Sequence, residues 1–266
     1  MADVERKLQG VDPISPLENY YGLKQHSYTI ILVPLFSGGY GPRMEQKDGA
    51  FDVYIIIGPR EAKAGLPDFG SAGNLERLAW HEFSHSFVNP ITERSIEGIN
   101  KYSSLYDPVS SWMKPQAYGN WETCVNEHLI RAVNGRLAYH QEYKEKGEKA
   151  AERALQDEIQ SQRSKGFFYV EALCKRLELY EANRVRYQTF VDFYPELITL
   201  FKELSEAKLG EDFFSIPFTG TINGVCTEKN RWFSSSLPKR VIRLSKIKSM
   251  LMLRKFGTVF LKTPLF

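Results

Sequence analysis

The sequence predicts an α+β fold in which a small β-sheet comes first and a mainly helical half follows. Two observations carry this prediction. Two short runs rich in β-branched and apolar residues occur within the first 60 residues, as is typical of buried strands. Residues 120–209 then show an almost continuous helical pattern, and a separation of strands from helices is typical of the α+β class.

The predicted strands are residues 27–36, SYTIILVPLF, and residues 51–57, FDVYIII. The stretch SGGYGP at 37–42 separates them as a turn-rich loop, and a Gly-Pro pair at 58–59 stops the second strand, because Gly and Pro are strong breakers of regular structure. A loop rich in these two residues is expected to continue to Gly73.

A helix is predicted after this loop, and it carries the segment WHEFSHSFVNP at residues 80–90. Asn74 is suited to cap its N-terminus. Asn89-Pro90 is expected to end it, since the residue before a proline disfavours the helical conformation. Residues 91–118 mix polar, Tyr and Pro residues, which predicts an irregular stretch with short helices.

The helical half is expected to break near Gly147, at Lys165-Gly166 and at Pro195, the last in the first turn of a helix. No run of about 18 apolar residues occurs, so no transmembrane segment is predicted. The N-terminus has no apolar core of a secretory signal. A signal removed earlier would leave the same sequence, so no cellular location is predicted.

Charge is distributed unevenly along the chain. Residues 229–266 contain ten Lys and Arg and no acidic residue, whereas residues 1–228 carry 25 basic against 32 acidic residues, a net charge of −7. We therefore divide the chain into a domain at 1–228 and a basic tail at 229–266, and expect no nucleic-acid partner. The tail fits three interpretations: an amphipathic segment for an anionic membrane surface, terminal strands that face the acidic body, or an ending foreign to the domain.

The segment at 80–90 contains the pattern His-Glu-x-x-His. Residues four apart on a helix share a face, so His81 and His85 can present two imidazoles to one cation. Glu82 is rotated by about 100° from His81 and would lie beside the metal, where it can take a proton from a water molecule. The pattern predicts a zinc (Zn2+) site; the competing interpretation is a core helix with two hydrogen-bonded histidines. Neither a disulfide framework nor a cysteine-bound metal is expected from the three dispersed cysteines, Cys124, Cys174 and Cys226.

A zinc site needs a third protein ligand, and the best candidates lie in the predicted helix WETCVNEHLIRAV. Asn126-Glu127 followed by Ala132 resembles the ligand helix of zinc peptidases whose third ligand is a glutamate, which favours Glu127. The apolar stripe of the same helix instead centres near Glu122 and predicts that Glu122 is the buried carboxylate, which makes it the alternative. His128 is the third choice, and all three are ligand types that zinc accepts.

The order of GGYGP, a strand, HEFSHSFVNP and WE-x-x-x-NEHLIRA resembles a bacterial family of uncharacterised domains that are thought to be gluzincin-like zinc metallopeptidases. The resemblance covers about residues 15–225, and HEFSHSFVNP is its specific part. It implies a zincin-like fold, zinc held by His81, His85 and a downstream glutamate, and Glu82 as the catalytic base.

The implied activity is hydrolysis of a peptide or protein substrate, with a zinc-activated water as the nucleophile and Glu82 as the general base. An extended peptide would add to a sheet edge beside the helix, at the GGYGP loop or at strand 51–57. Two other classes of protein are also compatible with the sequence. One is an inactive zinc-binding or peptide-binding protein, against which the intact Glu82 argues, and the other is a metal-free helical interaction module built on residues 120–209.

Other side chains can assist such a reaction. The oxyanion needs a second electrophile, and Tyr102, Tyr106 and Tyr118 lie between the two predicted ligand helices. Arg131, one turn beyond Glu127, could orient that carboxylate or bind a carboxylate of the substrate. For each of these four residues, a structural role is the competing interpretation.

Overall fold

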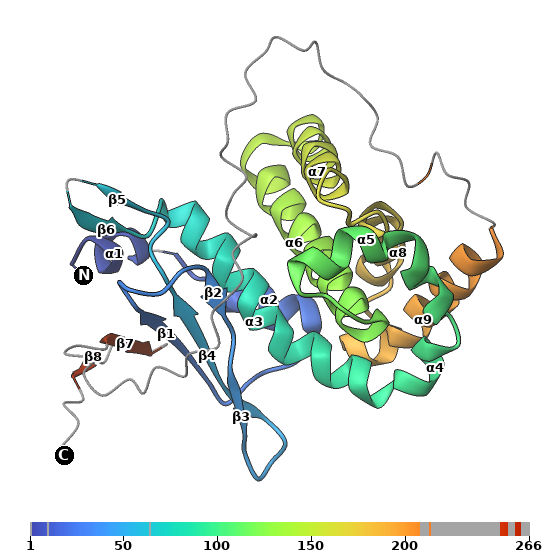
Figure 1. The fold of residues 1–266 in the computed structure, drawn as a ribbon, viewed down its shortest axis with the longest axis horizontal. Coiled ribbons are helices and arrows are strands. Elements are labelled where there is room, and N and C mark those ends of the chain that lie inside the picture. Colours follow the sequence, from blue (N-terminus) through green and yellow to red (C-terminus); the bar gives the residue numbers. More distant parts are fainter. Residues whose placement is uncertain are drawn as a thin grey trace. The chain divides into compact units, whose positions relative to one another are not determined.

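The computed structural model describes residues 2–9, 11–63, 65–207, 213, 251–254 and 259–261, the last two segments by their backbone alone. Within this part of the chain the fold is α+β, as predicted: a small sheet is followed by a mainly helical half (Figure 1). The described residues divide into two compact units, and each is treated by itself. Unit 1 comprises those within Met1–Ile91, Arg184–Phe193 and Leu244–Phe266, and unit 2 those within Thr92–Asn183 and Tyr194–Arg243.

Unit 1 contains a mixed sheet of six described strands: β1 (Ser27–Leu32), β2 (Gly39–Tyr40), β3 (Arg43–Glu45), β4 (Phe51–Ile57), β7 (Leu251–Arg254) and β8 (Val259–Leu261). Their order is β2-β4-β1-β7-β8, with β3 also paired to β4, and β1 and β4 are parallel. Strand 51–57 is confirmed at its predicted bounds. The first predicted strand ends earlier, at Leu32, because the chain turns where the Phe36 N–H donates to the Val33 carbonyl at 3.1 Å.

Strands β2 and β3 keep one register along β4. Gly39 pairs with Ile57 and Arg43 pairs with Val53, and between these pairs the Tyr54 N–H donates to the Pro42 carbonyl at 2.9 Å. The main-chain groups of Pro42 therefore face β4. Residues 39–45 act as one strand at the edge of the sheet, interrupted only where Pro42 has no N–H to donate.

The outer side of this edge strand can be derived from the register. In an antiparallel pair, residues whose N–H and C=O groups face the partner strand alternate with residues whose groups face away from it. Since the groups of Pro42 face β4, those of Gly39, Gly41, Arg43 and Glu45 are directed outward. The prediction of a loop throughout 37–42 is therefore wrong at residues 39–40, where pairing with β4 makes a strand from a glycine-rich segment.

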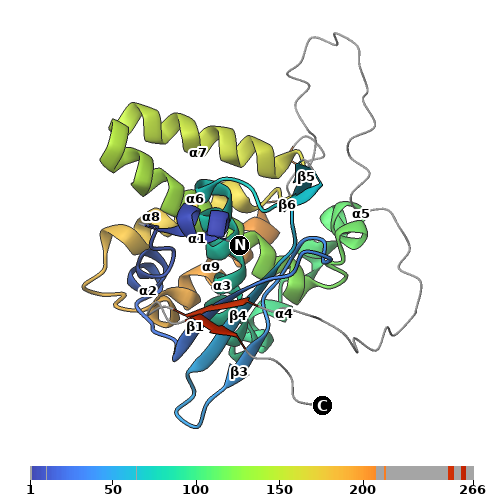
Figure 2. The same cartoon turned by 90° about the vertical axis from the view of Figure 1, so that its left-hand side faces the viewer.

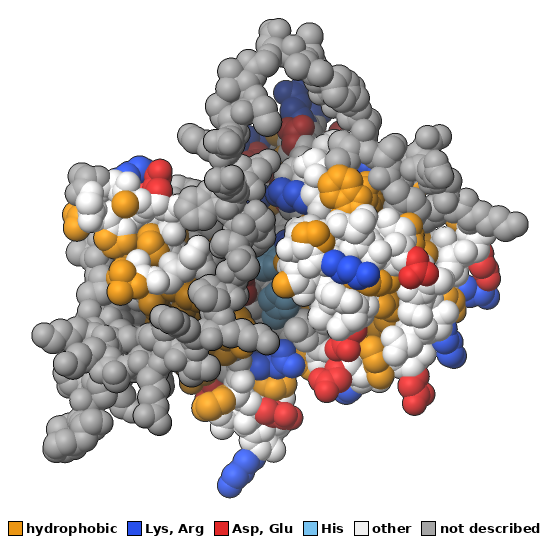
Figure 3. All heavy atoms as spheres, viewed as in Figure 1, with side chains coloured by type: hydrophobic (Ala, Val, Ile, Leu, Met, Phe, Trp, Pro, Cys, Tyr) orange, Lys and Arg blue, Asp and Glu red, His pale blue; other side chains and the backbone are white. Residues whose placement is uncertain are grey.

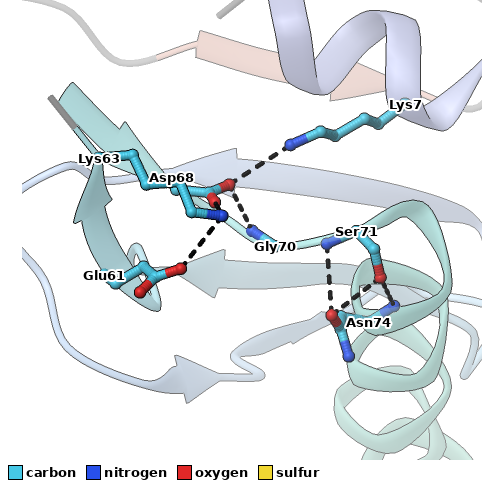
Figure 4. Close-up of polar contacts among 7 residues, drawn as sticks. All are labelled: Lys7, Glu61, Lys63, Asp68, Gly70, Ser71 and Asn74. Atoms are coloured by element: carbon cyan, nitrogen blue, oxygen red, sulfur yellow. Dashed lines mark hydrogen bonds and ion pairs between the residues drawn. The ribbon is translucent and has the colours of Figure 1, made fainter.

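A second, two-stranded sheet lies in the stretch predicted as a Gly- and Pro-rich loop, formed by β5 (Glu61–Lys63) and β6 (Leu66–Asp68). The Asp68 carboxylate lies 2.5 Å from the Lys63 ammonium and 3.3 Å from that of Lys7, and it accepts the Gly70 N–H at 3.0 Å (Figure 4). The hydrogen bond from Lys63 holds the pKa of the Asp68 carboxyl below its usual range. The loop prediction is wrong here because ionic and main-chain contacts, not an apolar alternation, define this hairpin.

The helices of unit 1 include α1 (Ala2–Leu8), α2 (Ser15–Tyr21) and α3 (Ala72–Arg94), whose last residues reach unit 2. Ser71, not Asn74, caps α3. The Asn74 N–H donates to the Ser71 hydroxyl at 3.2 Å, and the Asn74 side-chain oxygen accepts the Ser71 hydroxyl at 2.8 Å (Figure 4). This reciprocal bonding is the logic of a capping box, in which Asn74 is the third residue of the helix.

Helix α3 also continues past its predicted end at Asn89-Pro90, so that Pro90 lies inside it. A proline within a helix leaves the carbonyl four residues earlier without its helical partner, and that residue is Ser86. The Gln25 side-chain amide donates to the Ser86 carbonyl at 3.1 Å. This bond from the segment before β1 offsets the lost helical bond, which accounts for the continuation.

The stretch after α3 is irregular, as predicted, with α4 (Ile96–Asn100), the 3-10 helix η1 (Ser103–Val109), α5 (Ser110–Met113) and the 3-10 helix η2 (Lys114–Gln116). Ala117 then turns the chain with a φ of 71°, a left-handed conformation that residues with a side chain rarely adopt. Asn120 follows and caps the next helix, since its side chain accepts the Thr123 N–H at 2.8 Å.

Four further helices are α6 (Trp121–Lys146), α7 (Glu148–Arg163), α8 (Val170–Ala182) and α9 (Phe190–Glu206), of which α9 begins in unit 1. Helices α6 and α7 run side by side as an antiparallel pair (Figures 1 and 2). The breaks at Gly147 and Gly166 are confirmed, with φ values of 84° and 91°. On the face that Figure 3 shows, acidic and basic side chains are interspersed over the helices of unit 2.

The predicted break at Pro195 is wrong, because Pro195 lies inside α9. The helix begins five residues earlier, where Thr189 and Asp192 bond reciprocally: the Thr189 N–H donates to the Asp192 carboxylate at 2.8 Å, and the Asp192 N–H donates to the Thr189 hydroxyl at 3.3 Å. The signal of a capping residue followed three positions later by an acid was present in the sequence and marks the true start.

Most of the predicted tail at 229–266 lies outside the described residues. Its described segments are β7, which runs antiparallel to β1, and β8, which pairs with β7. For these two segments the arrangement corresponds to terminal strands; the other two interpretations concern residues that are not described, and the division at residue 228 stays a prediction. Among the described helices, none is long and apolar enough to cross a membrane.

Candidate functional site

Helix α3 presents the two histidines of the motif on one face, as their spacing predicts. The ring centroids of His81 and His85 are 5.2 Å apart, and the ring planes are nearly perpendicular. Both rings and the Glu82 side chain are half-buried, whereas Phe83 and Ser84 are buried. The motif therefore lies along the border between the core-facing side of α3 and its more accessible side.

The orientation of His85 is set by Asn89, one turn further along the helix. The Nδ1 atom of His85 lies 3.2 Å from the Asn89 side-chain oxygen, which acts as the acceptor when Nδ1 carries the proton. Metal-binding histidines commonly donate one ring N–H to such a partner and keep the other nitrogen for the metal. The sequence prediction assigned Asn89 only to the helix end; its i+4 spacing from His85 was the signal for this second role.

The Glu82 carboxylate packs against the edge strand of the same unit. A Cβ atom built on Gly39 would lie 2.8 Å from Glu82 Oε1, and one built on Gly41 would lie 3.2 Å from Oε2 and 2.9 Å from the Glu82 carbonyl oxygen. A side chain at Gly41 would therefore press on the main chain of α3, and a side chain at Gly39 would displace the Glu82 carboxylate. The GGYGP segment therefore forms a cradle for Glu82, a role that its interpretation as a loop did not anticipate.

Arg43, next along the edge strand, reaches the same helix. Its guanidinium donates to the His85 carbonyl at 3.4 Å and lies 5.1 Å from the centre of the Phe51 ring. This contact pins the edge strand to the turn of α3 that carries His85. Sequence reasoning did not identify Arg43, since its contact with α3 depends on the pairing of β3 with β4.

Helix α6 carries the two candidate carboxylates for the third ligand. Glu127 is 6% exposed, whereas Glu122, in the first turn, is half-buried. The expectation from the apolar stripe, that Glu122 is the buried carboxylate, is therefore wrong. Its premise fails because every residue from Cys124 to Ile130 is buried, so this part of the helix has no solvent-facing side from which a stripe could be defined.

Glu127 forms an ion pair with Arg131, one turn further along α6. The Arg131 Nη2 atom lies 3.1 Å from Glu127 Oε2, and it donates to the Tyr118 hydroxyl at 3.3 Å. The guanidinium also lies over the Phe167 ring, 3.9 Å from its centre. These contacts join Arg131 to Glu127 within unit 2; whether it orients that carboxylate, binds a substrate carboxylate or has a structural role stays a prediction.

His128, the third candidate ligand, belongs to the core of unit 2. Its Nδ1 donates to the Cys124 carbonyl at 2.7 Å, and its ring lies 5.1 Å from that of Phe167 and 5.3 Å from that of Tyr169. Burial lowers the pKa of His128 to about 3, so the imidazole is neutral near neutral pH. These contacts match the structural interpretation of this residue.

The tyrosines proposed as electrophiles differ in their surroundings. The Tyr106 hydroxyl donates to the Tyr118 carbonyl at 2.8 Å, and burial raises the pKa of Tyr106. The Tyr118 hydroxyl accepts from Arg131. Tyr102 is half-buried at the start of η1. Tyr106 and Tyr118 thus have structural contacts within unit 2, and a catalytic role for any of the three stays a prediction.

Comparison with known proteins places this site within one family. No curated protein and no solved structure matches the chain. A family model described as "Domain of unknown function (DUF4932)" matches residues 1–200, a range that includes the motif on α3, the edge strand and the whole of α6. The chain therefore belongs to the DUF4932 family.

Proposed function

We propose that the protein is a zinc metallopeptidase in which His81, His85 and Glu127 hold the metal and Glu82 is the general base. The observation that carries the proposal is the arrangement on α3. Two histidines share one face, and one of them is oriented by Asn89. Beside them lies the Glu82 carboxylate, against which the edge strand packs closely because Gly39 and Gly41 have no side chains. A core helix with two incidental histidines would require none of these features.

The residues fit zinc by the chemistry of their donors. His81, His85 and Glu127 each offer one ligand atom, two imidazole nitrogens and one carboxylate oxygen, in a group that could hold a metal ion. Three protein ligands of these kinds are the usual set of a catalytic zinc site, which keeps a further position open. Glu122 is the alternative third ligand, and its half-buried position makes it the weaker one.

The proposed mechanism divides the work between the metal and Glu82. Zinc would supply a Lewis acid that lowers the pKa of a water molecule to about 7. Glu82 would accept the proton of that water as it attacks the peptide carbonyl and would then deliver the proton to the leaving amine. The cradle of Gly39 and Gly41 holds the carboxylate in position for both transfers.

The edge strand suggests how a peptide would be held. Gly39 and Gly41 direct their main-chain groups outward, and the same two residues contact Glu82. An extended peptide that pairs with this edge would gain main-chain hydrogen bonds and would run directly beside the proposed base. The proposed substrate is therefore an extended or unfolded segment of a peptide or protein.

Metal analysis combined with a Glu82→Gln variant tests the proposal. We expect about one zinc per chain in both proteins, and loss of hydrolysis of a peptide library by about 100-fold or more in the variant, because Gln keeps the shape of the side chain but cannot accept the proton. Survival of hydrolysis within about tenfold, a barrier change of about 1.4 kcal/mol, would contradict the role of Glu82. Bound zinc without hydrolysis by the wild type would favour the inactive binding protein, and no bound metal would favour the interaction module.

A further inference from the structure

The ion pair of Glu127 and Arg131 is nearly buried. The side chains of Glu127 and Arg131 are 7% and 17% exposed, and the two charged groups lie 3.1 Å apart. An ionised carboxylate in such a place is costly unless a cation or hydrogen bonds compensate its charge. In the proposed mechanism the compensating cation is the metal, and α6 supplies a second cation from its own next turn.

Arg131 is held by contacts other than Glu127. Its guanidinium donates to the Tyr118 hydroxyl at 3.3 Å and lies 3.9 Å from the centre of the Phe167 ring, a favourable position for a cation over an aromatic face. A planar guanidinium fixed on two further sides can turn little. Its position is thus determined by unit 2 independently of the carboxylate.

The position of Tyr118 is itself determined by the chain around it. The Tyr118 N–H donates to the Met113 carbonyl at 3.1 Å, and its carbonyl accepts the Tyr106 hydroxyl at 2.8 Å. The preceding residue, Ala117, is the one non-glycine residue with a positive φ in the described part of the chain. Strained conformations of this kind persist where the surrounding contacts require them, and here they deliver the Tyr118 ring to Arg131.

We propose that Arg131 is the resident counter-cation of Glu127, the group that compensates the buried carboxylate while no metal ion is bound. Its guanidinium neutralises the buried carboxylate before a metal ion binds, and the carboxylate would be shared between the guanidinium and the metal once an ion is bound. This inference rests on the proposed role of Glu127 as a ligand. Tyr118 and the Phe167 ring hold the guanidinium beside the carboxylate.

A thermodynamic consequence follows from the sharing of one carboxylate by two cations. Without Arg131, the metal-free protein buries Glu127 with no cation beside it, whereas the zinc-loaded protein still has one. The loss of Arg131 therefore destabilises the metal-free protein more than the zinc-loaded protein. By linkage, zinc stabilises the Arg131 variant more than it stabilises the wild type. Removal of an arginine with a purely structural role would lower the stability of the metal-free protein and of the zinc-loaded protein equally.

The test is the thermal midpoint of unfolding, measured in EDTA and in excess zinc for the wild type and for Arg131→Met. We expect the variant to lose about 10 °C or more in EDTA and at most about half of that in zinc. In a Glu127→Gln background, which removes the shared charge, Arg131→Met should cost only a few degrees whether or not zinc is present. Arg131→Lys keeps the charge without the planar fork and should fall between wild type and Arg131→Met.

Arg136 offers a matched control on the same helix. It is 5% exposed and pairs with Glu178 at 2.9 Å and with Glu181 at 2.5 Å, neither of which is a proposed ligand. Arg136→Met should lower the midpoint by the same amount in EDTA and in zinc. Equal losses in both conditions for Arg131→Met as well would overturn the proposal.

Two further outcomes are separated by the same measurements. If Arg131→Met does not fold, Tyr118→Phe is measured instead. Its thermal midpoint should fall by a few degrees in EDTA and by less in zinc. Equal losses in the two conditions would again overturn the proposal. If zinc neither binds to the wild type nor raises its midpoint, the proposed function fails, whatever Arg131 does. Zinc binding by the wild type together with a zinc-independent loss in the variants leaves the proposed function standing and rejects the role of Arg131.

Discussion

Helices α3 and α6 carry the proposed ligands in contrasting surroundings. On α3 the motif residues are half-buried, and their roles follow from spacing along one helix. The middle of α6 is buried on every side, so Glu127 is distinguished from its neighbours by the arginine that it pairs with and not by its position in a pattern. The comparison teaches that candidate ligands on a half-buried helix can be recognised from their spacing in the sequence. On a fully buried helix they are recognised from the partners of its charged groups in the structure.

The largest effect is expected on the α3 side of this comparison. His81→Ala or His85→Ala should abolish stoichiometric zinc binding and lower the thermal midpoint in zinc, because a bound metal stabilises the folded state by mass action. Metal content and thermal unfolding measure both effects. His140→Ala removes a more exposed histidine on α6, 40% exposed, and should leave the metal in place. Full metal content in His81→Ala would refute the site.

The two carboxylates of α6 give the next largest effect. Glu127→Ala should weaken zinc binding more than Glu122→Ala, since Glu127 is the buried member of the pair and is held by Arg131. A competition titration against a zinc chelator measures both affinities. The opposite order would assign the ligand to Glu122 and would show that the apolar stripe, although wrong about burial, was the better guide to the ligand.

A smaller effect is expected one turn beyond the motif. Asn89→Ala removes the acceptor beside His85 Nδ1 and should weaken zinc binding by about 10- to 100-fold, as is typical for partners that orient a ligand. Asn89→Asp retains an acceptor oxygen and should keep most of the affinity in the same titration. Equal losses in the two variants would mean that Asn89 acts through the helix and not through His85.

The smallest effect on the site is expected from removal of the tail. A 1–228 truncation should keep zinc and any peptidase activity, because the proposed ligands and base all precede it. It removes β7 from its place beside β1, so a lower thermal midpoint is expected. A truncated protein that is folded yet has lost its metal would show that the tail belongs to the active domain.

Local patterns predicted much of the fold and of the motif helix. The strand at 51–57, the breaks at Gly147 and Gly166 and the shared face of His81 and His85 all follow from runs, breakers or periods within a few residues. Each needs no knowledge of the rest of the chain.

Several errors arose where distant segments meet. Gln25, 65 positions before Pro90 in the chain, donates the hydrogen bond to the carbonyl that Pro90 leaves without a helical partner. The contact of Gly39 with Glu82 depends on the pairing of the edge strand with β4. The choice between Glu122 and Glu127 depended on which sides of α6 are covered by other elements, and the sequence of this helix alone does not contain that information. The starts of α3 and α9 are a different case, because their capping pairs were visible in the sequence and were not recognised.

The edge strand at 39–45 has a consequence for the behaviour of the protein in concentrated solution. Among the described strands, none pairs with its outer side, and Pro42 does not block that side, because the N–H that it lacks would have faced β4. An open edge of this kind accepts a strand from any chain, including another copy of the same protein. Tyr40 and Met44, 60% and 57% exposed along it, add apolar surface to that template. If the edge is open for peptides, as proposed, the protein is thereby exposed to edge-to-edge polymerisation. The shortness of the strand and the charges of Arg43 and Glu45 are the features of this segment that oppose it.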